Sequence, residues 1–411
     1  MTDSKKTLLI TDIPPSRKQS GSLLTWNLCR NFVEDSLVCY FITSPNLKLK
    51  PEFPFEPSPH YVVASKADDH SYRPKYFPKI IRMLASFVRE IYRKHFQVPK
   101  HAKNVIKFAK EQHVDRIWII LQGQTMIWLA EYLIKKSDYP IRAQVWDPPT
   151  WWARHNNLDR LTKLNLFKSY EYCLRAADEL GSASFNMSRI VKEKFGRESY
   201  PLLGISPQLP RPVTSDDSLP TDKYVIGVAG QLYSTCTLKA FLISLDMIYW
   251  QIEGKPVEIH YWGNDRFPLE RSRIIKKPYV TQVQLLEELS KCHVLYCPYW
   301  VDYNFREEAR NSFPSKLVSY LNSERPILFH GPEDSSPGTL LNSKNAAICC
   351  FSDQAPYILY FLRKALFSPA VPEILKNAAR LAREELGEDL TMSNFRKFMK
   401  LAPESSRYES T

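Results

Sequence analysis

The chain has 411 residues and a net charge of +12, with 44% hydrophobic and 24% charged residues. These values exclude a disordered chain and are typical of a soluble globular protein. The length is sufficient for two domains of about 200 residues each. No run of about 18 apolar residues occurs, and the polar start is followed by only a short apolar stretch. We therefore expect neither a membrane span nor a signal peptide.

The positive charge favours an anionic partner such as a nucleotide, a lipid headgroup or a nucleic acid. The eight cysteines include no CxxC pair, which makes a zinc ribbon or a thioredoxin motif a poor fit. Without an export signal we expect reduced cysteines and a cytoplasmic protein. GxGxxG, GxxxxGK[ST] and DxD motifs are also absent, so neither a metal ion nor a cofactor is expected.

The first half of the sequence alternates predicted strands with predicted helices. Apolar runs predict strands, and apolar residues at helical spacing predict helices. The strands fall at residues 7–13, 37–42, 61–64, 116–120, 141–146 and 179–183. The helices fall at residues 22–32, 78–95, 123–136, 158–177 and 186–195, and Gly196 is expected to end the last of them.

Residues 206–223, rich in Pro, Ser and Asp, form the clearest linker in the sequence, and the alternation restarts after it. Strands are predicted at 224–229, 257–261, 293–297, 326–330 and 346–351. Helices are predicted at 237–250, 282–291, 314–321, 354–366, 372–386 and 393–400. Two alternating halves predict an α/β fold with two Rossmann-like, doubly wound domains and a ligand cleft between them.

Two loops of the first half are candidate sites. Gly21 and Ser22 open the helix after the first strand, where free backbone N–H groups attract phosphate. The alternative is an ordinary loop with a helix cap. Asp147, Trp151 and Trp152 follow a strand, and such a loop can stack on a sugar and accept its hydroxyl protons. The alternative there is a rigid proline turn packed by its tryptophans.

Two loops of the second half are candidates for binding an anion. Gly230, followed by Gln231, permits close approach of the backbone to a diphosphate, although one glycine is a weak signal. The segment 302–330 carries Arg306 and Arg310 and then Pro314, Ser315 and Lys316 at a predicted helix start. A helix start with a lysine and nearby arginines can bind an anion without a metal. The alternative is a solvated charged loop.

The predicted helix at residues 78–95 is basic and amphipathic. Apolar residues recur along it at intervals of three and four, and residues 72–110 include eleven Lys and Arg residues. The segment 72–110 could lie on an anionic membrane surface. Equally, the helix could pack its apolar face on the core. No nucleic-acid-binding motif accompanies the charge, so nucleic acid is not the expected partner.

Three segments together resemble the GT-B glycosyltransferases of glycosyltransferase family 4. Residues 177–196 are similar to the family's passage near the end of its N-terminal domain. Residues 224–230 are similar to the strand that opens its nucleotide-binding domain. Residues 312–321, with Arg325-Pro326-Ile327, are similar to its donor-site helix, and this is the most specific of the three matches.

The resemblance implies an acceptor-side domain at residues 1–205 and a nucleotide-sugar-binding domain at 224–370. Residues 371–411 would be helices that cross back to the first domain. It also implies metal-independent, retaining transfer of a sugar. In such an enzyme Lys316 and an arginine would neutralise the leaving diphosphate in place of a metal.

The sequence departs from the family's E-x7-E pair, whose positions fall on Asn311 and Ser319. Asn311 could still hydrogen-bond a sugar hydroxyl, whereas Ser319 changes the contact that usually holds the ribose. No basic residue occurs at 231–238, so Arg306 or Arg310 would have to substitute. His330, Ser335 and Ser336 follow the next strand and are expected to face the same donor.

Three functions are compatible with these residues. The first is a glycosyltransferase that moves a hexose from a nucleotide diphosphate sugar to a polysaccharide or lipid-linked acceptor, at the inner face of the membrane. Here Lys316 and Arg310 act on the leaving group, Asp147 assists the acceptor hydroxyl, and Trp151 and Trp152 hold the acceptor. The predicted donor site comprises Gly21, Ser22, Gly230, Gln231, Asn311, Ser315, Ser319, His330, Ser335 and Ser336. The others are a non-catalytic GT-B protein that binds a nucleotide sugar or a partner, and a peripheral membrane or polyanion-binding protein.

Overall fold

A computed structural model of the chain divides into two compact units, one of residues 1–203 with 391–411 and one of residues 204–390. It describes residues 5–17, 20–33, 35–67, 69, 78–156, 158–203, 219–278 and 280–401. Most of the predicted linker, and residues 72–77 of the predicted basic surface, lie outside these ranges. None of the described helices has the length and hydropathy needed to span a membrane.

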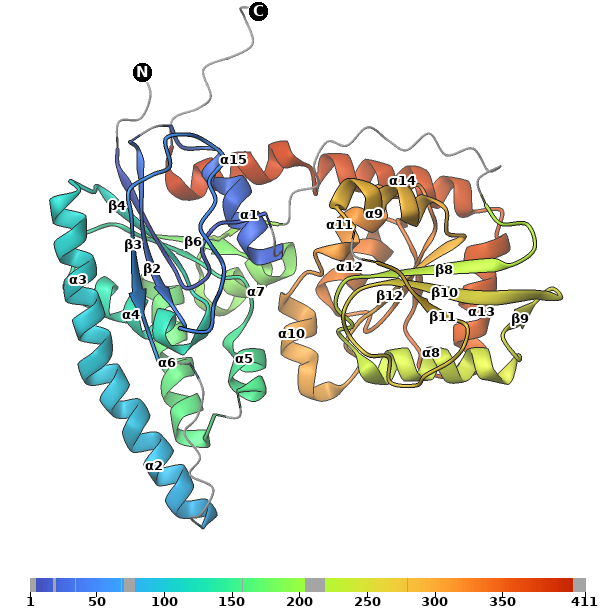
Figure 1. Cartoon of the computed structure of the whole chain (residues 1–411), viewed down its shortest axis with the longest axis horizontal. Coiled ribbons are helices and arrows are strands. Elements are labelled where there is room, and N and C mark those ends of the chain that lie inside the picture. Colours follow the sequence, from blue (N-terminus) through green and yellow to red (C-terminus); the bar gives the residue numbers. More distant parts are fainter. Residues whose placement is uncertain are drawn as a thin grey trace, which may run out of the picture. The chain divides into compact units, whose positions relative to one another are not determined.

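Unit 1 is built on a parallel sheet with strand order β3-β2-β1-β4-β5-β6-β7 (Figure 1). Its strands are β1 Thr7–Thr11, β2 Leu37–Thr43, β3 Tyr61–Ser65, β4 Arg116–Ile120, β5 Ile141–Gln144, β6 Glu179–Ser182 and β7 Tyr200–Pro201. Its helices are α1 Ser20–Cys29, α2 Lys79–Tyr92, α3 Val98–Glu111, α4 Gly123–Lys136, α5 Pro149–His155, α6 Arg160–Ala176 and α7 Phe185–Phe195.

The sheet of unit 1 carries an apolar core on each face. Side chains alternate along a strand, so Leu8 and Ile10 of β1 join the core beneath α3, α4 and α6, whereas Leu9 joins the core that contains Phe395. The fully buried pattern of β1 and β4 explains why these strands read as continuous apolar runs in the sequence. Gly196 ends α7 with φ 64°, as predicted.

Unit 2 repeats the design with strand order β11-β10-β8-β12-β13-β14, and the short β9 pairs antiparallel with β10. The strands are β8 Tyr224–Ala229, β9 Gln251–Ile252, β10 Lys255–Trp262, β11 Ile274–Lys276, β12 Val294–Pro298, β13 Ile327–His330 and β14 Ile348–Cys350. The helices are α8 Thr235–Met247, α9 Gln282–Ser290, α10 Arg306–Asn311, α11 Lys316–Leu321, α12 Ser336–Ser343, α13 Ala355–Phe367 and α14 Val371–Glu384. The expected α/β class with two Rossmann-like parallel-sheet domains is therefore confirmed.

Three segments differ from their predicted form. The helix expected at 78–95 continues through a π-helical turn at Arg93–Gln97 into α3, so the helical segment runs to Glu111. Residues 306–311, expected as loop, form α10, and α11 begins at Lys316 instead of Pro314. Of the closing helices, α14 belongs to unit 2, and unit 1 resumes at Thr391 within α15 (Glu388–Met399).

Candidate functional site

Each sheet has one topological switch point, on either side of which successive strands are added in opposite directions. We call this place the reversal. The reversal lies between β1 and β4 in unit 1 and between β8 and β12 in unit 2. In doubly wound folds, loops that leave the carboxyl ends of these strands form the ligand site. The residues that follow these four strands are therefore the first place to examine.

The most unusual residue at the unit 2 reversal is Lys316. It is only 8% exposed, yet its ammonium Nζ donates to the carbonyl of Gln231 at 2.5 Å and lies 4.7 Å from the ring centroid of Tyr233. No carboxylate among the described residues forms an ion pair with it. Burial lowers its pKa to about 8, against smaller raising effects from Cys297 and Asp265.

The loop after β8 is rigid around an open point at Gly230. This glycine has φ 71°, and nothing lies within 4 Å of the position that a Cβ would occupy. Its N–H donates to the carbonyl of Trp262 at 2.7 Å, and its carbonyl accepts from the Tyr261 hydroxyl at 3.1 Å. Asp265 accepts the N–H of Leu232 at 2.7 Å. The loop thus presents fixed, accessible backbone beside a buried cation, an arrangement that suits a bound anion.

The arginines after β12 are already paired in this structure. Arg310 donates through Nε and Nη2 to one oxygen of Asp334, at 2.9 and 2.5 Å, and Arg306 donates to the same oxygen at 3.3 and 3.1 Å. Burial would raise the pKa of Asp334, but the hydrogen bonds from Arg310 and Arg306 hold it below its usual value. Arg310 is therefore paired with a carboxylate in this structure.

The residues at the E-x7-E positions are both buried. Asn311 lies at the end of α10 and donates through Nδ2 to the carbonyl of Glu307 at 2.7 Å. Ser319 lies within α11 at 8% exposure. Ser315, just before α11, is exposed and makes no capping hydrogen bond with its side chain.

The residues at and just after the end of β13 have structural partners in the core. His330 is 1% exposed, its Nε2 donates to the carbonyl of Ser352 at 2.9 Å, and its Nδ1 accepts from Tyr296 at 2.8 Å. Burial lowers its pKa to about 4, so the ring is neutral. Ser335 caps α12 by accepting from Gly338 and donating to Pro332, and Ser336 is the first, buried residue of that helix. These side chains hold the edge of the sheet together.

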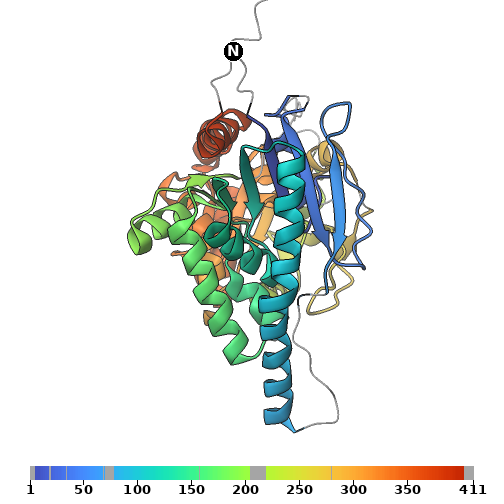
Figure 2. The same ribbon diagram turned by 90° about the vertical axis from the view of Figure 1, so that its left-hand side faces the viewer.

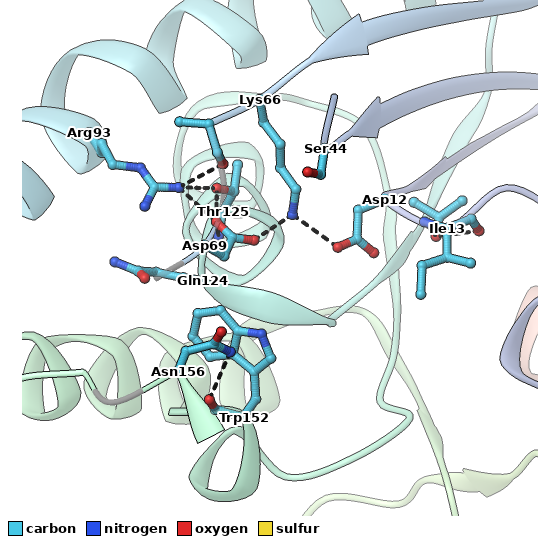
Figure 3. Close-up of polar contacts among 12 residues, drawn as sticks. Asp12, Ile13, Ser44, Lys66, Asp69, Arg93, Gln124, Thr125, Trp152 and Asn156 are labelled. Carbon is cyan, nitrogen blue, oxygen red and sulfur yellow. Dashed lines mark hydrogen bonds and ion pairs between the residues drawn. The ribbon is translucent and has the colours of Figure 1, made fainter. Parts of the chain in front are cut away.

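In unit 1 the reversal holds a buried cluster of charges that sequence analysis did not single out (Figure 3). Lys66, which follows β3, pairs with Asp12 at 2.9 Å and with Asp69. Arg93 pairs with Asp69 at 2.7 Å, and the Thr125 hydroxyl donates to the same carboxyl oxygen at 2.5 Å. We call these five residues the Lys66 cluster.

The two carboxylates of the Lys66 cluster differ in their surroundings. Burial raises the pKa of Asp12 despite its contact with Lys66. Burial also acts on Asp69, but Lys66 and Arg93 together hold its pKa below the usual value. One oxygen of Asp12, Oδ1, is buried and accepts no hydrogen bond within the described residues. Asp12 therefore offers a free acceptor atom at the carboxyl end of β1.

The glycine after β4 makes this close packing feasible. Gly123 has φ 76°, and a Cβ there would lie 2.8 Å from Oδ2 of Asp69. The start of α4 can therefore approach the cluster, and the N–H of Thr125 lies 3.3 Å from the Asp69 carboxylate. Any other residue at Gly123 would displace Asp69.

The predicted acceptor residues lie on the next loop of unit 1. Asp147 is exposed between β5 and α5, and Trp151 and Trp152 are half-buried on α5. Trp152 packs against the core, and its carbonyl accepts from Asn156 at 3.0 Å (Figure 3). None of these three belongs to the Lys66 cluster.

Gly21 and Ser22, predicted to bind the donor, lie in α1 of unit 1. A Cβ on Gly21 would come within 2.7 Å of the Trp146 ring, so this glycine makes room for an indole. Ser22 is fully buried, and its carbonyl accepts from the N–H of Ser16. The structure thus gives both residues a packing role within unit 1.

The Lys66 cluster was missed because its members are dispersed in the sequence. Asp12 was included in the strand predicted at residues 7–13, whereas β1 ends at Thr11 and Asp12 is the first residue after it. Arg93 was included only among the basic residues of segment 72–110, yet it is 3% exposed. The available signal was topological, since Asp12 and Thr125 follow the two strands that flank the reversal.

Comparisons with known proteins identify the fold. No protein-family model matches the sequence, and no curated protein matches it. Among solved structures, a sucrose-phosphate synthase from Thermosynechococcus elongatus is similar over 96% of this chain and 99% of its own, with a TM-score of 0.65 and 11% identity.

Two further structures agree. A trehalose 6-phosphate synthase from Burkholderia multivorans covers 96% of this chain and 98% of its own, with a TM-score of 0.60 and 13% identity. A trehalose-6-phosphate protein from E. coli, bound with UDP-2-fluoro glucose, has the same coverage, a TM-score of 0.61 and 11% identity. These structures are GT-B glycosyltransferases, and at such identities the likeness shows the fold.

Proposed function

We propose that the protein is a glycosyltransferase that moves a hexose from a nucleotide diphosphate sugar to a saccharide or lipid-linked acceptor. The observation that carries the proposal is Lys316, a buried ammonium group at the unit 2 reversal with a carbonyl and an aromatic ring as its neighbours. A buried cation without an ion pair is costly unless an anion binds it. The neighbour bound with UDP-2-fluoro glucose supports a nucleotide diphosphate as that anion.

The proposed donor site combines Lys316 with the open backbone at Gly230 and Gln231. The diphosphate lies against this loop, and Lys316 stabilises the negative charge that develops on it, without a metal ion or cofactor. Arg310 joins it when the diphosphate competes with Asp334 for the guanidinium group. The donor C1–oxygen bond breaks as the acceptor oxygen bonds to C1 with retention, and the leaving phosphate oxygen takes the acceptor proton.

The proposed acceptor contacts lie in unit 1. Oδ1 of Asp12, which has no hydrogen-bond partner among the described residues, would accept a hydrogen bond from an acceptor hydroxyl. Asp147 with Trp151 and Trp152 is the other proposed contact, through a carboxylate and indole rings that suit a sugar. Membership of glycosyltransferase family 4 remains part of the proposal, supported by residues 312–321.

The test is a thermal-shift screen of UDP, GDP, ADP, CMP and dTDP without added metal, on the wild type and on Lys316→Ala. A nucleotide present at 100 times its dissociation constant should stabilise the wild type by about 2.7 kcal/mol and leave the variant unchanged. Turnover of that nucleotide's sugars then tests transfer. Binding without turnover would favour the non-catalytic alternative, and no response to any nucleotide would overturn the donor site.

A further inference from the structure

Helix α2 exposes a row of apolar side chains. Ile80, in the first turn of α2, is 68% exposed, and Val88, in its second half, is 65% exposed, although both are aliphatic. The exposed apolar residues recur at intervals of four along one side, which makes them a continuous stripe. We call this set the α2 stripe: Ile80, Ile81, Leu84, Val88, Tyr92 and Phe96.

The inner side of the same helical segment is polar. Ser86, Glu90 and Arg93 are buried, at 1%, 2% and 3% exposure. Glu90 accepts from Gln124 at 2.5 Å, and Arg93 pairs with Asp69 at 2.7 Å. Ser86 donates to Asp159 at 3.3 Å. Unit 1 therefore holds this helix by hydrogen bonds and ion pairs, the reverse of a core-packed amphipathic helix. The prediction that its apolar face would be free for a surface is favoured over core packing.

The exposed charges along this segment are mostly positive. Its acidic residues are Glu90, which is buried, and Glu111, at the end of α3. The exposed basic residues continue along α3 beyond the stripe, at intervals of three and four, as Lys100, Lys103, Lys107 and Lys110. Figure 2 shows α2 and α3 as one long helix, blue to cyan, whose first turns extend beyond the sheet of unit 1. An apolar stripe and a row of lysines thus share one projecting element.

We propose that the α2 stripe and the α3 lysines dock the protein on an anionic lipid bilayer. Apolar side chains on such a helix enter the boundary between headgroups and acyl chains, while lysines approach the anionic headgroups. Charge decides between the partners that an apolar stripe could have. A second copy would bring another row of lysines toward this one, and like charges repel. A nucleic acid would satisfy the lysines but would leave the stripe in water.

Vesicle flotation without nucleotide tests the proposal separately from the donor site. The vesicles contain about 30% phosphatidylglycerol in phosphatidylcholine, with pure phosphatidylcholine for comparison. The variant Ile80→Gln/Leu84→Gln/Val88→Gln replaces three residues of the N-terminal half of the stripe. The matched control is Ile243→Gln/Met247→Gln on α8 of unit 2, where the side chains are 42% and 62% exposed. Both variants alter only exposed residues, and circular dichroism checks that each remains folded.

The wild type and the control should bind the anionic vesicles, and the stripe variant should bind at least about tenfold more weakly. Lys100→Gln and Lys103→Gln should each weaken binding by about fivefold, an effect that high salt removes. Equal binding by the stripe variant, or no binding by the wild type, would overturn the proposal. So would a dimer in sedimentation analysis that the stripe variant converts to monomer, because the stripe would then join two copies.

Discussion

Replacing Lys316 by methionine should make the ligand-free protein more stable and abolish its response to nucleotide diphosphates. Methionine has a similar length and fills the same buried space without a charge. A residue that only supported the fold would destabilise the protein when replaced. A gain in stability together with a loss of the response to nucleotide therefore distinguishes a binding residue from a structural one.

The magnitude follows from the pKa of Lys316. Burial lowers it from 10.5 to about 8. This difference means that burying the charged group costs about 3 kcal/mol of folding free energy. Loss of the hydrogen bond to Gln231 offsets about 1 kcal/mol. The variant should thus be more stable by about 2 kcal/mol at pH 7, or about 5 °C in the unfolding transition of unit 2.

The pH dependence of the stability gives a second check on the free-energy cost of burying the charged Lys316. Below pH 8 Lys316 is charged in both the folded and the unfolded chain, so its cost to folding is constant. Between pH 8 and 10.5 the unfolded chain binds more protons, so the stability of the wild type rises with pH. The difference between variant and wild type should therefore close at about pH 9.5, and above about pH 10.5 the wild type should be the more stable by about 1 kcal/mol.

Calorimetry of the wild type, Lys316→Met and the surface control Lys291→Met measures these values, with and without the nucleotide found by screening. Lys291 pairs with Glu288 at 2.6 Å and is 56% exposed, so its replacement should change little. Lower stability of Lys316→Met at pH 7, together with an unchanged response to nucleotide, would refute the reasoning.

Four further outcomes are expected. Lys66→Met should lower the free energy of unfolding of unit 1 by about 3–5 kcal/mol in urea, because it leaves Asp12 buried without its cation and Asp69 with Arg93 alone; Lys110→Met is the control. The ring of His330, whose pKa is about 4, should show no NMR titration between pH 5 and 8; a shift there would mean that the ring is accessible. Asp12→Asn should raise the acceptor KM at least about tenfold without changing donor affinity, and a larger effect of Asp147→Asn would place the acceptor at the exposed loop instead. Arg310→Ala should lower kcat/KM at least about tenfold and Arg306→Ala much less; equal effects would mean that both act through Asp334.

The alternation of elements could be predicted from the sequence because its cause is local. Buried parallel strands such as β1 and β8 are short apolar runs, and the helices between them carry apolar residues at helical spacing. Short elements were missed for the same reason. Helix α10 is six residues long and highly charged, so its composition resembles that of a loop.

The candidate site could be predicted only in part. Lys316 was predicted because it lies in a contiguous motif, and Gly230 because it directly follows a strand. His330, Ser335 and Ser336 are equally close to a strand end, yet the structure gives their side chains partners in the core and in a helix cap. Their sequence position correctly predicts that they lie at the carboxyl end of the sheet, but it does not predict the direction in which their side chains point.

The sequence by itself determined the two-domain α/β organisation, the excess of positive charge and the position of Lys316 at the start of a helix. Tertiary structure alone decided that Asp12, Lys66 and Asp69 meet, since strand order brings together residues that no local pattern connects. It also decided that α2 is held by its polar side. Helical periodicity shows that a helix has two faces, but only the partners across the fold, Asp159 among them, determine which face is turned inward.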